Sequence, residues 1–580
     1  MAIGLPRMRR AGLVRQEPSA LPADAQLQPA CAHWAPQASR RTRNCPLASE
    51  LEVQCSLFVP LMNKVSSSVR VVLGNAFANV LRGGIAALVA IALPPILTRS
   101  LPVSTFGVWG LVLQLGAYVG VLDFGLQTAV SRFVAHYNEL GDRTRRDSVI
   151  STAFAALAAL GTVALAGMLV LAWQLPRIFP QMPGPLHGEA RLALVMVGGS
   201  LAFSLPLGTF NSIFIGLQRN EVPTAIVVTG KVVGGGLVVL AARLGGGLVW
   251  MAVGMSAANV ATALAQYWTC RHVAPDMRLS RSLVSREAGR ELFDYCFSLA
   301  VWLVGMLLVS GLSTTIVGML DFKSVAYFTV AVSLTNYLAG LQNAVFTALM
   351  PVAAALGARQ DARRLGEVLI ATTRYGMLIL LLTGLPLIIC SFWILRLWVG
   401  RDYALHAQPF LQILVAAQII RLSATPYAVL LMGTGQQRLV ILTPLIEGAI
   451  NLISSVLLGM RLGAIGVAWG ALIGGVVGLT CHFAYNMPRT KSISFLFGRY
   501  LKSGILRPLA ATLPVVPLSI GLLLFGPNSF LAAAITLVSG GLLLWLLWRF
   551  AVDPEERNRV VRYLFSGRKL PWGARAPLVE

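Results

Sequence analysis

The chain has 580 residues, of which 56% are hydrophobic and 12% are charged, and its formal net charge is +24. Soluble proteins carry about 25% charged residues, so this composition excludes an ordinary soluble domain and indicates a polytopic membrane protein. The basic residues gather in short loops between apolar runs, which indicates loops retained in the cytoplasm and argues against a nucleic-acid-binding surface.

Residues 1–64 precede the first apolar run and are rich in Ala, Pro, Gln and Arg. They lack helical periodicity and hold no apolar run suited to a signal peptide. We interpret them as a disordered or mis-annotated N-terminal extension. The segment that opens at Met62 (MNKVSSSVR) is typical of a short cytoplasmic leader, so we expect translation to start at Met62.

The remaining sequence predicts an all-α membrane protein with about 14 transmembrane helices. Its apolar runs are each long enough to cross about 30 Å of hydrocarbon as a helix. Strand-type alternation is absent, so the pattern does not favour a barrel. We place the helices at residues 72–97, 103–131, 149–173, 190–215, 222–241, 246–268, 292–319, 324–350, 372–395, 407–431, 439–459, 463–485, 504–526 and 528–549.

Positive charge alternates between the two sets of loops. The loops after helices two, six, eight and twelve are the richest in Arg and Lys, and the loops between them carry one or two basic residues each. This alternation predicts a multi-pass membrane protein with both termini in the cytoplasm, as an even helix count requires.

The chain contains an internal repeat with an offset of 219 residues. At this offset the ungapped matches pair Leu115 with Leu334, Tyr118 with Tyr337, Asp142 with Asp361, Arg145 with Arg364, and GLQR at 216–219 with GQQR at 435–438. A slip of one residue aligns Arg243-Leu244-Gly245 with Arg461-Leu462-Gly463. The offset spans six helices, an even number, so both copies enter the membrane in the same sense and form parallel repeats.

The repeat predicts two six-helix bundles plus two C-terminal helices. The expected parts are an N-lobe (65–270), a basic cytoplasmic linker (271–291), a C-lobe (292–488), helices 13 and 14 (489–550) and a basic cytoplasmic tail (551–580).

Five charged residues fall inside apolar spans: Arg82, Asp123, Lys231, Arg421 and Glu447. Each would cost roughly 2.5–3.5 kcal/mol at the bilayer centre if it faced lipid, so we expect them to face water or one another. At the repeat offset four of them align with uncharged residues, namely Val301, Ile450, Ala202 and Val228 for Arg82, Lys231, Arg421 and Glu447. The repeated scaffold therefore does not itself require these charges.

The three cations and the two acids support different hypotheses. Guanidinium groups bind phosphate oxygens in bidentate fashion, so Arg82, Lys231 and Arg421 are candidates to line a cationic cavity for an anionic headgroup such as a diphosphate. Asp123 and Glu447 either bind a coupling ion or form salt bridges, and Arg421 with Glu447 is a candidate structural pair.

No nucleophile, metal or phosphate-loop motif is present, and the seven cysteines form neither a disulfide framework nor a metal site. We therefore expect no catalytic residues, no cofactor and no metal.

The phrases YVGVLDFGLQTAVSRFVA (118–135), FIGLQRNEVPTA (214–225) and LLMGTGQQR (430–438), with the duplication, resemble the polysaccharide export family. This family comprises the O-antigen flippases of the multidrug/oligosaccharidyl-lipid/polysaccharide exporter superfamily. The resemblance covers roughly residues 65–550. It implies two facing lobes with a cationic central cavity and alternating access that carries a polyprenyl-diphosphate-linked oligosaccharide across the inner membrane.

The leading hypothesis is therefore a flippase of O-antigen, lipopolysaccharide or exopolysaccharide biosynthesis. Its expected partners are the lipid-linked oligosaccharide, membrane lipids, and a polysaccharide polymerase with its chain-length regulator; nucleic acid is not expected. Two alternatives stay open: a multidrug or cation antiporter of the same superfamily, which would favour acidic and aromatic cavity residues, and a membrane oligosaccharide polymerase, which would favour a large outward loop.

Overall fold

The computed structural model describes residues 82–347, 349–436, 440, 442–515, 530–552 and 557–558, and every regular element in these stretches is helical. They belong to one compact unit, Val69–Glu580. The expected extension (1–64), with Met62, and most of the expected basic tail (551–580) lie outside the described residues.

Twelve helices of the described chain are long and apolar enough to cross a membrane, and they match the first twelve predicted spans. At the positions of predicted helices 13 and 14, residues 516–529 lie outside the described stretches, so the count of fourteen stays a prediction. The flanking described elements there are the π-helical segment Tyr500–Leu506, α20 (Arg507–Thr512) and α22 (Phe530–Leu546).

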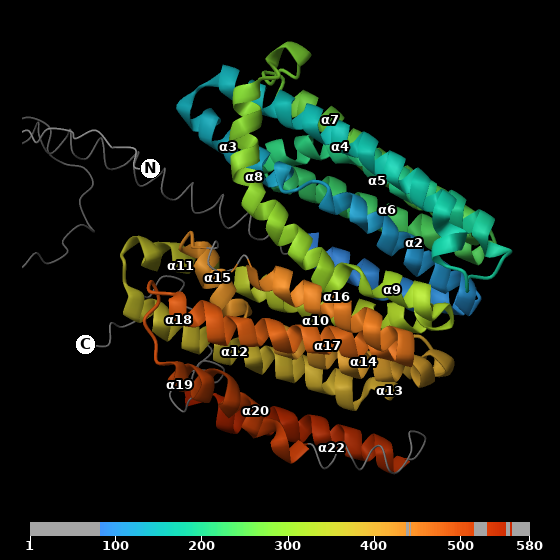
Figure 1. Ribbon diagram of the computed structural model, residues 1–580, viewed down its shortest axis with the longest axis vertical. Coiled ribbons are helices and arrows are strands. Elements are labelled where there is room, and N and C mark those ends of the chain that lie inside the picture. The colour runs from blue at the N-terminus through green and yellow to red at the C-terminus, as the bar shows by residue number, and fades with distance from the viewer. Residues whose placement is uncertain are drawn as a thin grey trace, which may run out of the picture. The chain divides into compact units, whose positions relative to one another are not determined.

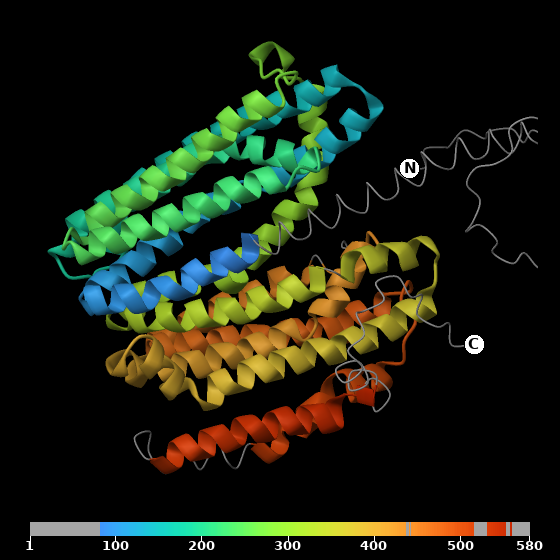
Figure 2. The same ribbon diagram turned by 180° about the vertical axis from the view of Figure 1, so that it is seen from behind.

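The two lobes repeat the same helix pairs. The N-lobe comprises the helix Arg82–Ser100, α2 (Val103–Val121), α3 (Leu126–Leu140), α4 (Arg143–Ile178), α5 (Leu186–Gly216), α6 (Glu221–Arg243) and α7 (Gly247–Val273). The C-lobe comprises α8 (Arg286–Met306), the π-helical segment Leu307–Gly311, α9 (Ser313–Leu320), α10 (Val325–Thr347), α11 (Leu349–Ala358), α12 (Ala362–Ile389), α13 (Ser391–Trp398), α14 (Arg401–Leu422), α15 (Thr425–Gly433), α16 (Leu442–Leu462) and α17 (Ala464–Cys481). In the N-lobe α5 packs against α2, α4 and α7; in the C-lobe α14 packs against α10, α12 and α17 (Figures 1 and 2).

Two pairs of helix ends agree with the repeat. The Asp142 carboxylate accepts the Arg145 N–H at 3.0 Å and caps α4, and the Asp361 carboxylate accepts the Arg364 N–H at 3.0 Å and caps α12. Gly245 and Gly463, which the one-residue slip aligns, both have positive φ where α6 and α16 end.

The structure corrects the alignment of GLQR with GQQR. The helix before each loop ends in a residue of positive φ, Gln218 in the first copy and Gly435 in the second. The N–H after each of these residues bonds to the carbonyl five residues before it, from Arg219 to Phe214 and from Gln436 to Leu431. The offset between these turns is 217, so the sequence match at 219 does not follow the backbone here.

The predicted helix 103–131 is interrupted in the structure. It ends at Val121, a turn follows, and α3 begins at Leu126. Gly125 has φ +81°, and a Cβ there would lie 2.9 Å from Leu299 of α8, so only glycine suits both the turn and the close approach. Asp123 therefore lies in a turn and not within a helix, which corrects the prediction.

The lobes contact each other through small and polar residues of α2. A Cβ on Gly110 would lie 2.7 Å from Thr329 of α10, so glycine permits this helix crossing. Farther along α2, Gln114 and the Tyr118 hydroxyl both donate to the carbonyl of Gly311, at 2.7 and 2.8 Å. Because Gly311 ends the π-helical segment, the contact uses a carbonyl that regular helix bonding does not occupy.

The segment predicted as a basic linker is bound to the N-lobe. Arg146 of α4, which is 3% exposed, pairs with Asp147 at 2.9 Å and with Asp276 at 3.1 Å. The Ser148 hydroxyl donates to the carbonyl of Leu283 at 2.9 Å. These bonds hold the start of α8 beside α4, and α8 then runs from the N-lobe to the C-lobe (Figure 1).

Candidate functional site

Arg82 and Lys231 are close together in the N-lobe. Arg82 begins the first described helix and is half-buried, and Lys231 lies on α6 with an exposed side chain. Arg82 lies one helical turn before Ala86, on the same helix face, and Ala86 lines the cavity that Lys231 also lines. Two cations on neighbouring helices repel each other in a medium of low dielectric constant, so a dianionic ligand between them is favoured.

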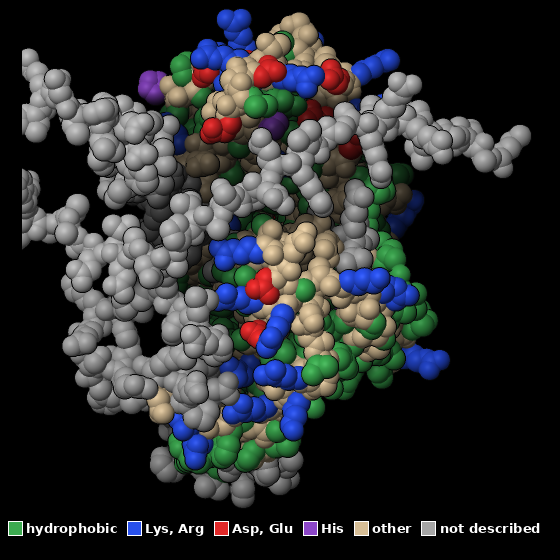
Figure 3. All heavy atoms as spheres, turned by 90° about the vertical axis from the view of Figure 1, so that its left-hand side faces the viewer, with side chains coloured by type: hydrophobic (Ala, Val, Ile, Leu, Met, Phe, Trp, Pro, Cys, Tyr) green, Lys and Arg blue, Asp and Glu red, His purple; other side chains and the backbone are tan. Residues whose placement is uncertain are grey.

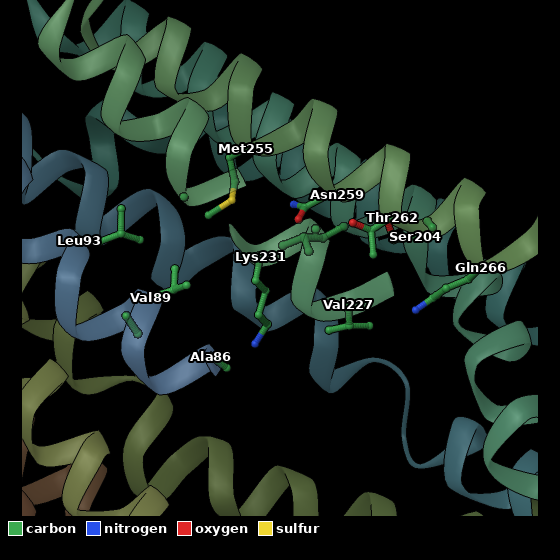
Figure 4. A pocket seen from close by; sticks show the side chains of 15 residues that line it. Ala86, Val89, Leu93, Ser204, Val227, Lys231, Met255, Asn259, Thr262 and Gln266 are labelled. Atoms are coloured by element: carbon green, nitrogen blue, oxygen red, sulfur yellow. The ribbon is translucent and has the colours of Figure 1, made fainter. Parts of the chain in front are cut away.

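Lys231 lines a cavity of about 370 Å³ between the helix Arg82–Ser100, α5, α6 and α7. This volume falls in the range of roughly 300–1,000 Å³ that is typical of ligand pockets. Figure 4 shows the Lys231 side chain extending from α6 into open space beside Ala86. A lysine that faced lipid near the bilayer centre would be costly, so its position at a cavity supports the expectation that this charge faces water, which stays a prediction.

The cavity has one apolar and one polar wall. Ala86, Val89, Ala90 and Leu93, spaced along one face of the first described helix, form the apolar wall. The opposite wall carries four neutral polar residues that the sequence analysis did not single out: Ser204, Asn259, Thr262 and Gln266. The spacing of the last three along α7 was a signal that could have identified them.

Arg421 lies in the C-lobe and forms a salt bridge with Glu447. Its Nε donates to the Glu447 carboxylate, which joins α14 to α16, and its Nη1 donates to the Gln418 side chain at 2.9 Å. The two side chains are 14% and 10% exposed. Within the described residues the Arg421 Nη2 is buried without a hydrogen-bond partner. The structure thus forms the candidate pair, and it does not bring Arg421 into the cavity that Lys231 lines.

Glycines of α17 make room for this pair and for the polar residues that follow it on α16. A Cβ on Gly478 would lie 2.7 Å from the Glu447 carboxyl carbon, and a Cβ on Gly474 would lie 2.7 Å from Asn451. Asn451 donates to the carbonyls of Leu308 and Val309, at 3.2 and 2.6 Å, and so satisfies part of the π-helical segment. The close α16–α17 packing is therefore what buries Glu447.

Asp123 has a backbone partner. Its carboxylate accepts the N–H of Gln127 at 3.0 Å, and it forms no ion pair within the described chain. A role in binding a coupling ion stays a prediction for both Asp123 and Glu447. Nowhere in the described stretches do three His, Cys, Asp or Glu side chains gather as a metal site would need.

Residues 72–356 match the family model described as "Polysaccharide biosynthesis protein". This stretch belongs to the polysaccharide biosynthesis protein family. The match begins just before the described part of the N-lobe and ends in α11, so it covers the first lobe, including Lys231, and the first helices of the second lobe. A comparison with curated proteins gave no match.

Solved structures of related fold agree with this family. The lipid II flippase MurJ, in an inward closed conformation, is 13% identical and covers 82% of this chain and 99% of its own, with a TM-score of 0.63. A multidrug resistance MATE family transporter of the MOP superfamily, in an inward-facing conformation, is 18% identical over 70% of this chain and 98% of its own, with a TM-score of 0.55. A MOP superfamily transporter from Pyrococcus furiosus, whose structure is titled for the reverse polarity of its binding pocket, is 16% identical over 72% and 95%, with a TM-score of 0.53. At these identities the likeness shows a shared fold, that of the MOP superfamily.

Proposed function

We propose that this polysaccharide biosynthesis family member is a flippase, not an enzyme, and that it moves a polyprenyl-diphosphate-linked oligosaccharide across the inner membrane for O-antigen or exopolysaccharide biosynthesis. The observation that supports this most strongly is the Lys231 ammonium at a cavity inside a MOP-type fold, with Arg82 one helical turn before the lining residue Ala86. A diphosphate and sugars cannot cross hydrocarbon unaided, whereas such a cavity offers cations to the headgroup and leaves the prenyl chain in lipid.

The orientation of the chain in the membrane follows from the charge of the loops. Figure 3 views the molecule from the end at which α3, α11, α18 (Met487–Arg489) and α19 (Phe497–Arg499) lie, and Lys and Arg side chains crowd this face. We take this face as cytoplasmic because basic loops are retained on that side. The Gly110–Thr329 crossing then lies farther from the cytoplasm than the α4–α8 contact, and the cargo enters from the inner leaflet.

The binding step uses the cations of the N-lobe, where Arg82 and Lys231 neutralise the diphosphate. We propose that Arg421, whose Nη2 is buried without a hydrogen-bond partner in the described part of the chain, reaches the headgroup only in another state of the transport cycle. Glu447 fixes the orientation of the Arg421 guanidinium through the Nε bond. Alternating access requires similar affinity on both sides of the membrane, so that the cargo can leave as readily as it enters.

A cation antiporter is disfavoured by the same residues. A cationic drug would be repelled by the Arg82–Lys231 pair, and no acidic residue lines the cavity that Lys231 enters. We also propose that the transported oligosaccharide passes to a polymerase with its chain-length regulator on the outer face.

The experiment is deletion of the gene in a strain that makes the corresponding surface polysaccharide. We expect surface polysaccharide to be lost and prenyl-diphosphate-linked repeat units to accumulate in the inner leaflet, with both effects reversed by the plasmid-borne gene. Normal surface polysaccharide without accumulation would refute the proposed function.

A further inference from the structure

The neutral polar wall of the Lys231 cavity is arranged as one continuous surface. On α7, Asn259, Thr262 and Gln266 are spaced by three and four residues, so they share one helix face, and Ser204 of α5 adds a hydroxyl beside them. Figure 4 shows these four side chains in a row along the cavity, with the Gln266 amide and the Lys231 ammonium both extending toward its open side.

Two side chains of this wall form hydrogen bonds within the N-lobe, and these bonds hold them in place. The Asn259 amide donates to the Ser200 hydroxyl at 3.2 Å, and the Thr262 hydroxyl donates to the carbonyl of Ala258 at 2.7 Å. The Asn259 carbonyl oxygen and the lone pairs of Thr262 then remain as acceptors, and the Gln266 amide as a donor. Acceptors and donors in alternation suit hydroxyl groups better than they suit a second phosphate.

The scaffold does not require the whole row. The one-residue slip that aligns Gly245 with Gly463, just before α7 and α17, aligns Asn259 with Val477, Thr262 with Thr480 and Gln266 with Ala484, so the second lobe repeats only one of the three polar residues. Within the N-lobe the cavity is kept open by glycine: a Cβ on Gly230 would overlap the Thr262 hydroxyl, and a Cβ on Gly235 would lie 3.1 Å from Val89.

We infer that Ser204, Asn259, Thr262 and Gln266 form a subsite for the sugar ring attached directly to the diphosphate, and that this subsite sets which first sugar the protein accepts. The inference rests on the proposed function. A pyranose has hydroxyls at its edge and apolar C–H faces, which match the polar α7 wall and the opposite wall of Ala86, Val89 and Leu93. The Lys231 ammonium lies beside both walls, where the phosphate of the same ligand would be.

The test measures binding to the purified full-length protein by calorimetry. The probes are farnesyl diphosphate and farnesyl diphosphate bearing either N-acetylglucosamine or galactose. For the unaltered protein we expect at least one sugar-bearing probe to bind about tenfold more tightly than farnesyl diphosphate.

Three near-isosteric variants remove the polar groups one at a time: Asn259→Leu, Thr262→Val and Gln266→Met. We expect each to remove most of the sugar-dependent gain and to leave the dissociation constant for farnesyl diphosphate within about twofold of the original. That unchanged constant also shows that the variant is folded. Gln174→Met on α4, which makes the same chemical change away from the cavity, is the control and should alter neither constant.

The outcomes separate the two proposals. If the unaltered protein binds none of the three probes, the proposed function is refuted. If it binds farnesyl diphosphate but no sugar adds affinity, or if the wall variants change binding of all probes alike or of none, the sugar subsite is refuted while the proposed function stands.

Discussion

Glu447→Gln leaves the Arg421 guanidinium as an uncompensated charge inside the C-lobe. The pair is 14% and 10% exposed, and Gly478 packs directly over the carboxylate, so water cannot replace the lost partner. Breaking a buried pair on one side costs about 3–5 kcal/mol, whereas exchanging both members for apolar residues of similar volume is close to neutral. We therefore expect Glu447→Gln and Arg421→Met each to lower the free energy of unfolding by about 3 kcal/mol, and Arg421→Met with Glu447→Leu to recover most of this loss.

Stability is measured by unfolding in mixed detergent micelles, and transport is measured after the same preparations are reconstituted into proteoliposomes. Arg421 is also proposed to contact the cargo. The double variant should therefore be stable, but its transport rate should fall to a small fraction of the original rate. Losses of stability that add in the double variant would refute the buried pair. A stable double variant with full transport would instead refute the substrate role of Arg421.

Further predictions concern local packing and caps. Gly478→Ala should lower the free energy of unfolding by about 1–3 kcal/mol, because its Cβ would lie 2.7 Å from the Glu447 carboxyl carbon. Gly236→Ala, whose Cβ would meet nothing within 4 Å, is the control and should be neutral. Equal thermal midpoints of the two variants in detergent would contradict this prediction. Asp142→Ala and Asp361→Ala should each cost about 1 kcal/mol and add in the double variant, since they cap equivalent helices in separate lobes; strongly unequal losses would count against equivalent caps. Asp147→Asn should weaken the attachment of residues 274–285 to α4, so limited proteolysis of this segment should become faster. The control is Asp294→Asn, which changes an exposed carboxylate on α8 and should leave the cleavage rate unchanged. An unchanged cleavage rate in Asp147→Asn would show that the Arg146 pairs do not hold the segment.

Much of the fold could be predicted because membrane spans are read from length and hydropathy, and the repeat from matched residues. The twelve spans follow from these patterns, and so does the equivalence of Asp142 and Asp361, which the structure shows as caps of corresponding helices. The interruption at Asp123 could not be predicted from hydropathy, since Val121 and Leu126 are equally apolar on both sides of it. It depends on the positive φ of Gly125 and on the approach of Leu299, which is a tertiary contact.

The site was predictable in part. The free-energy cost of a charged side chain in the bilayer identifies Arg82, Lys231 and Arg421 as residues that need a partner or water. It does not identify which residues contact one another. The approach of Glu447 to Arg421 depends on the glycines of α17. The polar row of Asn259, Thr262 and Gln266 is uncharged, so the energetic cost of charge in an apolar span does not identify it.

The most direct measurement of the central claim is translocation of a fluorescent prenyl-diphosphate oligosaccharide by the protein in proteoliposomes, comparing the original chain with Lys231→Gln, Arg82→Gln and the double variant. Arg177→Gln, an exposed arginine at the end of α4, is the control. We expect each single variant to transport at least tenfold more slowly, the double variant to approach the rate of empty liposomes, and the control to match the original. Undiminished transport by the double variant would contradict the claim that this pair of cations binds the diphosphate.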